Sequence, residues 1–183
     1  MKIQIALLSL VLCAAASQAA VAQTRPESSL SLEPWNAHLR AIGSTGTAST
    51  GIEFILLNPA SGYAAAGLEA TRASGAEGVT DFDLGAGFSV GSGTLFLNLR
   101  NRSWGAIAED LGIDDLTVRE SSATLGYGSP LVGNLFAGGF SVTLLSADYL
   151  GNASTAWTFD LGVMSRLHDR LSVGVALLRP FAT

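Results

Sequence analysis

"DFDLGAGFSVGSGTLFLNLR", residues 81–100, alternates between large apolar side chains and small or polar ones. The large apolar residues are Phe82, Leu84, Phe88, Val90, Leu95, Leu97 and Leu99. The positions between them include Asp81, Asp83, Gly85, Gly87, Ser89, Asn98 and Arg100. Such alternation predicts β-strands with two unlike faces. In a soluble sheet the apolar face would cover a protein core, whereas in a membrane barrel it would contact lipid and the polar face would line the interior.

The same period of two continues along most of the chain and predicts seven strands. Their expected ranges are 67–73, 81–90, 94–103, 117–128, 135–148, 154–167 and 170–179. Several reach ten residues, which is longer than the usual strand of about five or six and matches the roughly 9 to 11 residues that cross a bilayer. We therefore predict an all-β fold, an antiparallel up-and-down transmembrane β-barrel that follows an N-terminal irregular or short helical segment.

The connections between the predicted strands alternate in length. The turn at 91–93 is tight, whereas the acidic loop at 104–116 is long, and outer-membrane barrels have short periplasmic turns and longer outside loops. This assignment predicts two aromatic girdles, one near the outer ends of the strands and one near the periplasmic ends. The outer set is Phe82, Trp104, Tyr149 and Trp157, and the periplasmic set is Phe88, Tyr127 and Phe136. The role of the acidic loop stays open.

The number of predicted strands is odd. Bacterial single-chain barrels have even strand numbers, so we expect the segment 67–183 to form an incomplete barrel. The sequence leaves open whether the chain is truncated or contributes to a larger wall.

The N-terminus has the features of a secretory signal peptide. Lys2 supplies the positive start, residues 3–16 are apolar, and Ala20-Val21-Ala22 is a small-x-small cleavage site. We predict a signal peptide at 1–22, a periplasmic plug-like segment at 23–66, and a location in the outer membrane.

Composition excludes several classes of protein. After the first 20 residues no run of about 18 apolar residues appears, so a helical membrane protein is not expected. Without residues 1–22 the chain has neither Lys nor Cys, and its nine Arg face fifteen acidic residues, which gives a net charge of −6. An acidic chain without basic clusters is not expected to bind nucleic acid, and no disulfide is expected.

The sequence contains no recognisable catalytic or metal-binding arrangement, so we predict neither an enzyme nor a cofactor. The acidic residues of the loop at 104–116 suit either a calcium site or, more simply, a solvated loop. The candidate functional residues are instead the polar side chains expected to face the barrel interior: Asn98, Arg100, Arg102, Glu120 and Ser122. Neighbouring strands would pair Arg with Glu across the wall, or these groups would only solvate and stiffen the interior.

Two stretches resemble the PorV/PorQ-type proteins of the FadL-like outer-membrane barrel superfamily. One is "LLNPASGYAAAG" at 56–67, with Asn58, Pro59 and Ala60 as the family triplet, although Ser61-Gly62 follows it here in place of Gly-Leu or Gly-Ala. The other is "FDLGVMSRLHDRLSVGVAL" at 159–177.

The resemblance implies an outer-membrane protein that serves type IX secretion or carries hydrophobic molecules. Its expected partners are outer-membrane lipid and either secretion-system proteins or a hydrophobic ligand. The alternative from the residues alone is a secreted, soluble β-sandwich that acts in binding or adhesion.

Overall fold

The computed structural model describes residue 48 and residues 54–64, 66–74, 79–104, 118–132, 135–149, 151–168 and 171–178. The predicted signal peptide, most of the segment 23–66 and most of the acidic loop lie outside these residues. The elements are a 3₁₀ helix and seven strands: η3 (Pro59–Ala64), β1 (Gly67–Ser74), β2 (Val79–Val90), β3 (Gly93–Trp104), β4 (Val118–Val132), β5 (Phe136–Tyr149), β6 (Asn152–His168) and β7 (Leu171–Leu177).

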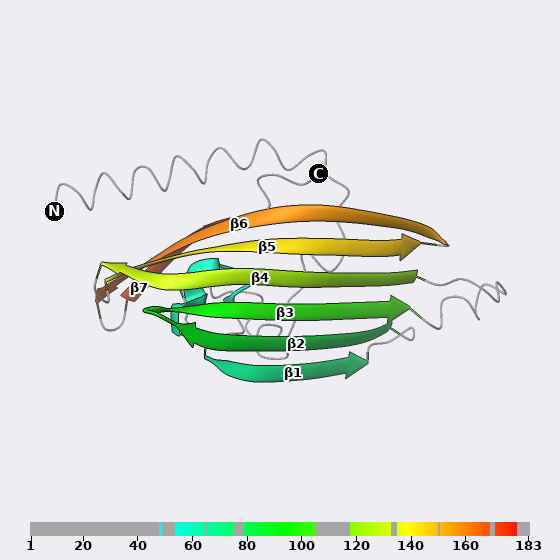
Figure 1. Cartoon of the computed structure of the whole chain (residues 1–183), viewed down its shortest axis with the longest axis horizontal. Helices are drawn as coiled ribbons and strands as arrows, with labels where there is room; N and C mark the ends of the chain where they lie inside the picture. The colour runs from blue at the N-terminus through cyan, green and yellow to red at the C-terminus, as the bar shows by residue number, and fades with distance from the viewer. Residues whose placement is uncertain are drawn as a thin grey trace.

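The seven strands form one antiparallel sheet in the order β1-β2-β3-β4-β5-β6-β7. The sheet curls into a half-barrel, with η3 and β7 behind the front strands (Figure 1). The fold class predicted from the sequence is therefore confirmed: an up-and-down β-sheet with the curvature of a partial barrel.

Local sequence explains where the strands turn. Gly91 and Gly151 have positive φ values of 61° and 79°, and each lies in a two-residue hairpin turn, where this conformation matches the twist of the flanking strands. β4 continues to Val132, four residues beyond its predicted end at 128, because Pro130 is accommodated next to a register shift between Pro130 and Val132. Proline is tolerated in a sheet at such an irregularity.

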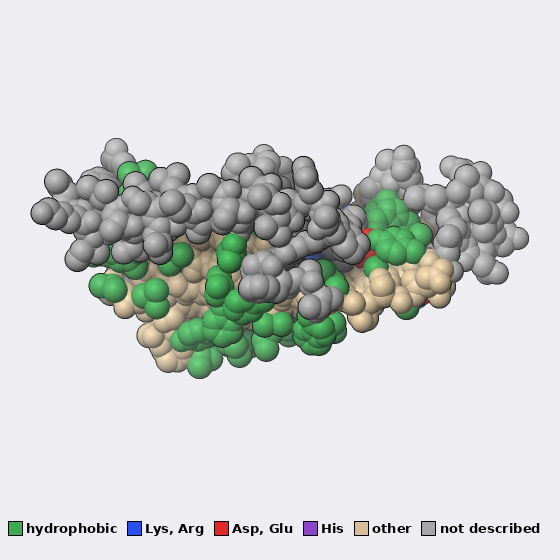
Figure 2. Space-filling model, turned by 90° about the horizontal axis from the view of Figure 1, so that it is seen from above, with side chains coloured by type: hydrophobic (Ala, Val, Ile, Leu, Met, Phe, Trp, Pro, Cys, Tyr) green, Lys and Arg blue, Asp and Glu red, His purple; other side chains and the backbone are tan. Residues whose placement is uncertain are grey.

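The two faces of the sheet have the reverse of the polarity of a water-soluble protein. Arg100 and Arg102 on the concave side are only 6% and 3% exposed, whereas Leu97 and Leu99 on the convex side are 38% and 39% exposed. Among the described residues, fifteen polar or charged residues are buried against seven apolar ones, Pro59 included and glycines left aside. Charged side chains are almost never buried in soluble domains unless they are paired. Apolar side chains gather along the convex side of the sheet (Figure 2).

The convex face is divided into polar and apolar rows by the strand register. The two outward-facing rows nearest the turn between β5 and β6 are polar. They contain Ser103, Arg119 and Asp148, and then Asn101, Ser121 and Ser146. The apolar belt follows, closer to the Gly91 turn. We define it as Leu95, Leu97 and Leu99 together with the residues that pair with them, row by row, on the other strands. On β6 this belt runs from Trp157 to Leu161, and the next outward position, Val163, is also apolar; together they extend roughly 20 Å along the strand at about 3.4 Å per residue. Outer-membrane barrels carry a comparable apolar band, about 25 Å tall.

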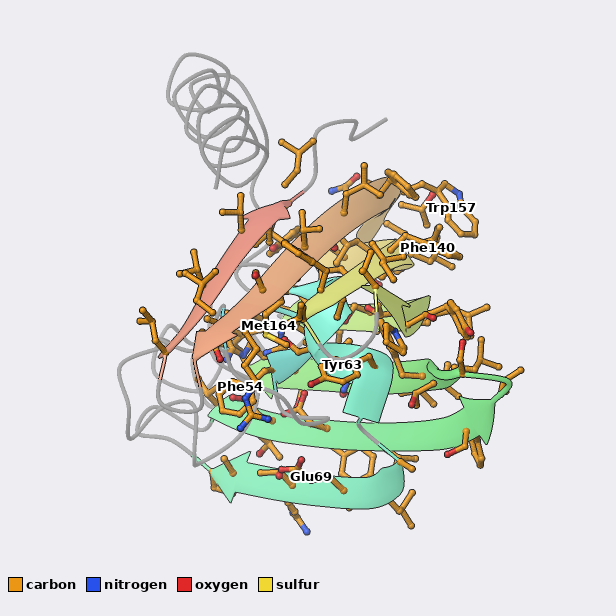
Figure 3. All side chains as sticks on the ribbon, turned by 90° about the vertical axis from the view of Figure 1, so that its left-hand side faces the viewer. Phe54, Tyr63, Glu69, Phe140, Trp157 and Met164 are labelled. Carbon is orange, nitrogen blue, oxygen red and sulfur yellow. The ribbon has the colours of Figure 1, made fainter. Side chains whose placement is uncertain are left out.

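The predicted aromatic girdle is wrong for two of its seven members. Trp104 has the same strand parity as the buried Arg102, and the Arg102 guanidinium lies 5.6 Å from the centre of the Trp104 ring. Tyr149 has the parity of the buried Thr143 on β5. Both rings therefore belong to the concave face. Trp157, by contrast, lies on the outside of the curl (Figure 3), as Phe82, Phe88, Tyr127 and Phe136 do by their parity.

Candidate functional site

The concave face is occupied at one end by η3, which contacts β3, β4, β5 and β6. The curled strands surround this helix, with Tyr63 and Met164 on the inside (Figure 3). The sequence Asn-Pro-Ala starts the helix for clear reasons. The Asn58 Oδ1 accepts a hydrogen bond from the Ala60 N–H at 3.0 Å, as an N-cap side chain does. Pro59 occupies the first helical position, where its missing N–H costs nothing.

Three glycines form a seat beneath this helix. Gly128, Gly139 and Gly162 are register partners on β4, β5 and β6, and we call this row the glycine seat. A Cβ at Gly128 would lie 2.8 Å from the Tyr63 nitrogen and one at Gly139 would lie 2.6 Å from the Ala60 nitrogen. Real Cβ atoms essentially never come that close, so only glycine admits the helix backbone at this depth.

Side-chain contacts hold the segment on its seat. The Asn58 Nδ2 donates to the Val163 carbonyl at 3.3 Å, and Asn58 is fully buried. Ile55 packs on Phe96, and Ala60 packs on Ala137 and Met164. These contacts account for most of the buried apolar side chains among the described residues. The apolar core of this sheet is thus a local one, between the Asn58–Ala64 segment and the concave face.

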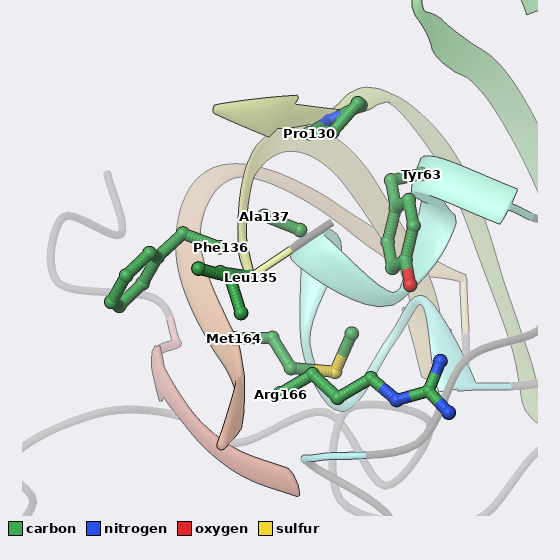
Figure 4. Close-up of a pocket in the computed structure, with 7 residues that line it drawn as sticks. All are labelled: Tyr63, Pro130, Leu135, Phe136, Ala137, Met164 and Arg166. Carbon is green, nitrogen blue, oxygen red and sulfur yellow. The ribbon is translucent and has the colours of Figure 1, made fainter. Parts of the chain in front are cut away.

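A small hollow remains beside the helix (Figure 4). Its lining residues are Tyr63, Pro130, Leu135, Phe136, Ala137, Met164 and Arg166. The lining is largely apolar, with one hydroxyl and one guanidinium group. The hollow is no larger than about one water molecule requires, so the seated helix packs closely against this part of the concave face.

The opposite end of the concave face carries buried ion pairs. The Arg102 guanidinium donates from Nε and Nη2 to the two oxygens of Asp81 at 2.6 Å and 2.9 Å. The Arg100 Nε donates to Asp83 Oδ1 at 2.8 Å. Each pair consists of register partners on β2 and β3. Paired charges of this kind are strongly held in position, because separating them inside the fold leaves an uncompensated charge.

All five residues singled out from the sequence lie on the concave face. Arg102 and Glu120 are register partners in one row, Arg100 and Ser122 are partners in the next, and Asn98 lies in the third row beside Thr124. Each of the five is less than a tenth exposed. The structure therefore brings them together as one continuous polar patch on β3 and β4.

The two arginines form ion pairs with β2, which join Arg100 to Asp83 and Arg102 to Asp81. The expected pairing of Arg with Glu stays a prediction. Glu120 is the cross-strand neighbour of Arg102 and accepts a hydrogen bond from the Tyr149 hydroxyl. Sequence reasoning did not select the two aspartates as site residues. Their alternation on the polar face of the strand at 81–90 was the available signal.

A row of neutral polar groups separates the ion pairs from the helix. Thr124 and Thr143 share a hydrogen bond of 2.8 Å between their hydroxyl groups, and Asn98 and Thr158 flank them in the same row. In the next row toward η3, the Ser141 hydroxyl donates to Asp160 at 3.3 Å. Along the strand direction, the concave face therefore changes from ion pairs, through a neutral polar row and a row that contains Asp160, to a helix packed on glycine.

Other kinds of site have no support in the described residues. No group of three or more His, Cys, Asp or Glu side chains is close enough there to hold a metal ion. In the same part of the chain, no helix has both the length and the apolar character needed to cross a bilayer.

Comparisons of the chain with protein-family models, with curated proteins and with solved structures find no match. The function is therefore argued from the geometry above.

Proposed function

We propose that the chain forms part of the wall of an outer-membrane β-barrel, of PorV/PorQ or FadL-like type. Its role would be in secretion or in the transport of hydrophobic molecules, without catalysis of its own. The observation that carries the proposal is the inverted polarity of the sheet: the Asp81–Arg102 pair is buried on the concave side while Leu97 and Leu99 are exposed on the convex side.

The energetics favour lipid as the medium of the convex face. Complete removal of a large apolar side chain from water is worth about 1.5–3 kcal/mol. The most exposed large side chains of the apolar belt are 38–58% exposed, so contact with lipid would gain the corresponding part of this value on several neighbouring strands. A soluble β-sandwich would place that face against a second sheet and its charged residues in water. The described residues have the opposite arrangement, with the charges on the inside of the curl.

The helix on the glycine seat gives the proposed barrel a closed state. η3 lies at the same end of the strands as the Gly91 turn, which the connection lengths assign to the periplasmic side. Passage along the concave face would require the Asn58–Ala64 segment to leave its seat. The ion pairs at the other end would then form a charged mouth on the outer side.

Cell fractionation tests the proposal directly. The full chain, expressed with its own N-terminus in a Gram-negative host, should sediment with outer membranes and float with liposomes in a density gradient. Extraction should require detergent rather than salt or alkaline carbonate. Recovery of the folded chain from periplasm or medium without detergent would instead support the soluble β-sandwich.

A further inference from the structure

Two aromatic rings lie at the end of the concave face that is opposite η3, one on each side of Val118. Trp104 of β3 and Tyr149 of β5 are both register partners of Val118 on β4. Neighbouring strands lie about 4.8 Å apart, so the two rings start from backbone positions about 10 Å apart. Because both rings belong to the inside of the curl, they face a common space above the Val118 side chain. Tyr149 is 42% exposed, and Trp104 and Val118 are partly exposed, so this space is accessible to a dissolved molecule.

Each ring contacts a charged group in the next row toward η3. The Arg102 guanidinium lies 5.6 Å from the centre of the Trp104 ring, and the Tyr149 hydroxyl donates to Glu120 Oε1. Arg102 and Glu120 are themselves register partners and are only 3% and 1% exposed. Buried groups therefore hold both rings in place, and a ligand that binds between rings already in position loses less free energy in ordering them.

The charge beside the two rings is negative. The next two rows toward η3 carry three carboxylates and two guanidinium groups, a formal charge of −1, on Asp81, Asp83, Glu120, Arg100 and Arg102. Glu120 lies two residues from Val118 on the same face of β4, about 7 Å along the strand. Charges that line a concave surface attract ligands of the opposite sign. The space between the rings therefore favours a cation.

From this geometry we infer that Trp104 and Tyr149 bind an organic cation that carries a trimethylammonium group. A cation within about 6 Å of the centre of an aromatic ring is attracted to the face of that ring. A cation midway between these two rings would lie about 5 Å from each backbone position in projection, and its methyl groups would contact Val118. The site belongs to the folded concave face whatever the medium outside, so the inference goes beyond the proposed membrane function.

Other classes of ligand fit the site less well. Ca²⁺ takes about six to eight oxygen ligands, which a site walled by two rings and a valine does not offer. Glu120 and Arg102 are almost fully buried and present little surface for hydrogen bonds with a neutral sugar, whereas their charges act at a distance. A lipid head group is disfavoured because the rings face the inside of the curl, away from the apolar belt. The ligand is therefore a dissolved cation such as choline.

The test titrates choline against the fluorescence of Trp104. Trp35→Phe and Trp157→Phe leave Trp104 as the single tryptophan of the full chain. The chain is refolded in micelles of a polyoxyethylene detergent, which contains neither ammonium groups nor sugar. The matched control ligand is 3,3-dimethylbutan-1-ol, which has the shape of choline without its charge. We expect saturable quenching by choline and binding of the neutral alcohol that is at least about tenfold weaker.

Two substitutions in the site separate the contribution of a ring from that of the charge. Tyr149→Leu should weaken choline binding about fivefold, the value of one partly exposed cation–π contact. Glu120→Gln should weaken it at least as much, because it removes the net negative charge. The control for a lost ring is Tyr127→Leu on the convex face, which should change the affinity less than twofold. The comparison of choline with the neutral alcohol uses the unaltered site, so it decides the matter where a variant does not fold.

Several results would overturn the inference. They are equal affinity for choline and the alcohol, quenching by choline that does not saturate, equal losses in Tyr149→Leu and Tyr127→Leu, or tighter binding of glucose than of choline. Tighter binding of glycerophosphocholine than of choline would assign the site to a lipid head group and would overturn it as well. Flotation of the unaltered chain with liposomes tests the proposed function separately: binding without flotation refutes that function alone, and flotation without binding refutes this inference alone.

Discussion

Replacing Gly139 with alanine should lift the Asn58–Ala64 segment from the concave face. The added Cβ would lie 2.6 Å from the Ala60 nitrogen, about 1 Å inside ordinary van der Waals contact. The atoms it meets are helix backbone, which cannot rotate away as a side-chain tip can. The segment must therefore rise from its seat, and its contacts with Gly128 and Gly162 weaken at the same time.

The size of the effect follows from overpacking. Forcing one extra carbon into a well-packed site costs about 1–3 kcal/mol. The free energy of the seated position therefore rises by that amount relative to the lifted position, and each 1.4 kcal/mol is about a tenfold change in an equilibrium constant. The fraction of molecules with the segment lifted should therefore rise by about 5-fold to about 140-fold.

Thiol labelling measures this fraction. Ser61 is fully buried in the seated segment, so Ser61→Cys provides a buried thiol that reacts with a maleimide only when the segment lifts. The matched control is Gly138→Ala, one residue away and on the convex face, where the new Cβ would meet only the flexible, exposed side chain of Leu131. Labelling rates within twofold of each other in the Gly139→Ala and Gly138→Ala backgrounds would refute the steric argument.

Three further outcomes are expected. Asp81→Asn should destabilise the folded chain by about 3–5 kcal/mol, because it removes the buried carboxylate that accepts two hydrogen bonds from Arg102; urea unfolding in micelles measures this, and an unchanged midpoint would contradict it. Leu97→Arg in the apolar belt should cost about 2–4 kcal/mol of folding into liposomes, and Ser121→Arg in the polar row about 0–1 kcal/mol; equal effects would argue against lipid at this face. Asn58→Ala removes two hydrogen bonds, each worth about 0.5–1.5 kcal/mol, and should speed labelling of the Ser61→Cys thiol; an unchanged rate would show that the seat alone holds the segment.

The strands and their faces could be read from the sequence because alternation is a local signal. The period of two places Leu95, Leu97 and Leu99 on one side whatever the rest of the chain does, and the structure has them there. By the same count Trp104 lies on the opposite side, with Arg102. A position near a strand end therefore does not by itself place a ring in the outer girdle.

The contacts of the Asn-Pro-Ala triplet could not be read in the same way. The resemblance pointed to Asn58, but its seat consists of Gly128, Gly139 and Gly162, which lie far apart in the sequence. They become neighbours only through the register of three strands. No local sequence pattern distinguishes a glycine that packs beneath a helix from a glycine that forms a turn. The ion pairs of Arg100 and Arg102 with Asp83 and Asp81 likewise depend on the register of β2 and β3.

The two ends of the concave face are held together by different forces, so they are sensitive to different kinds of substitution. Shape and dispersion secure the end that contains the glycine seat, and neither depends on ionic conditions. Counter-charges secure the other end through Asp81 and Asp83. A change in side-chain volume should therefore disturb the base on which Asn58 rests, whereas a change in side-chain charge should disturb the opposite end.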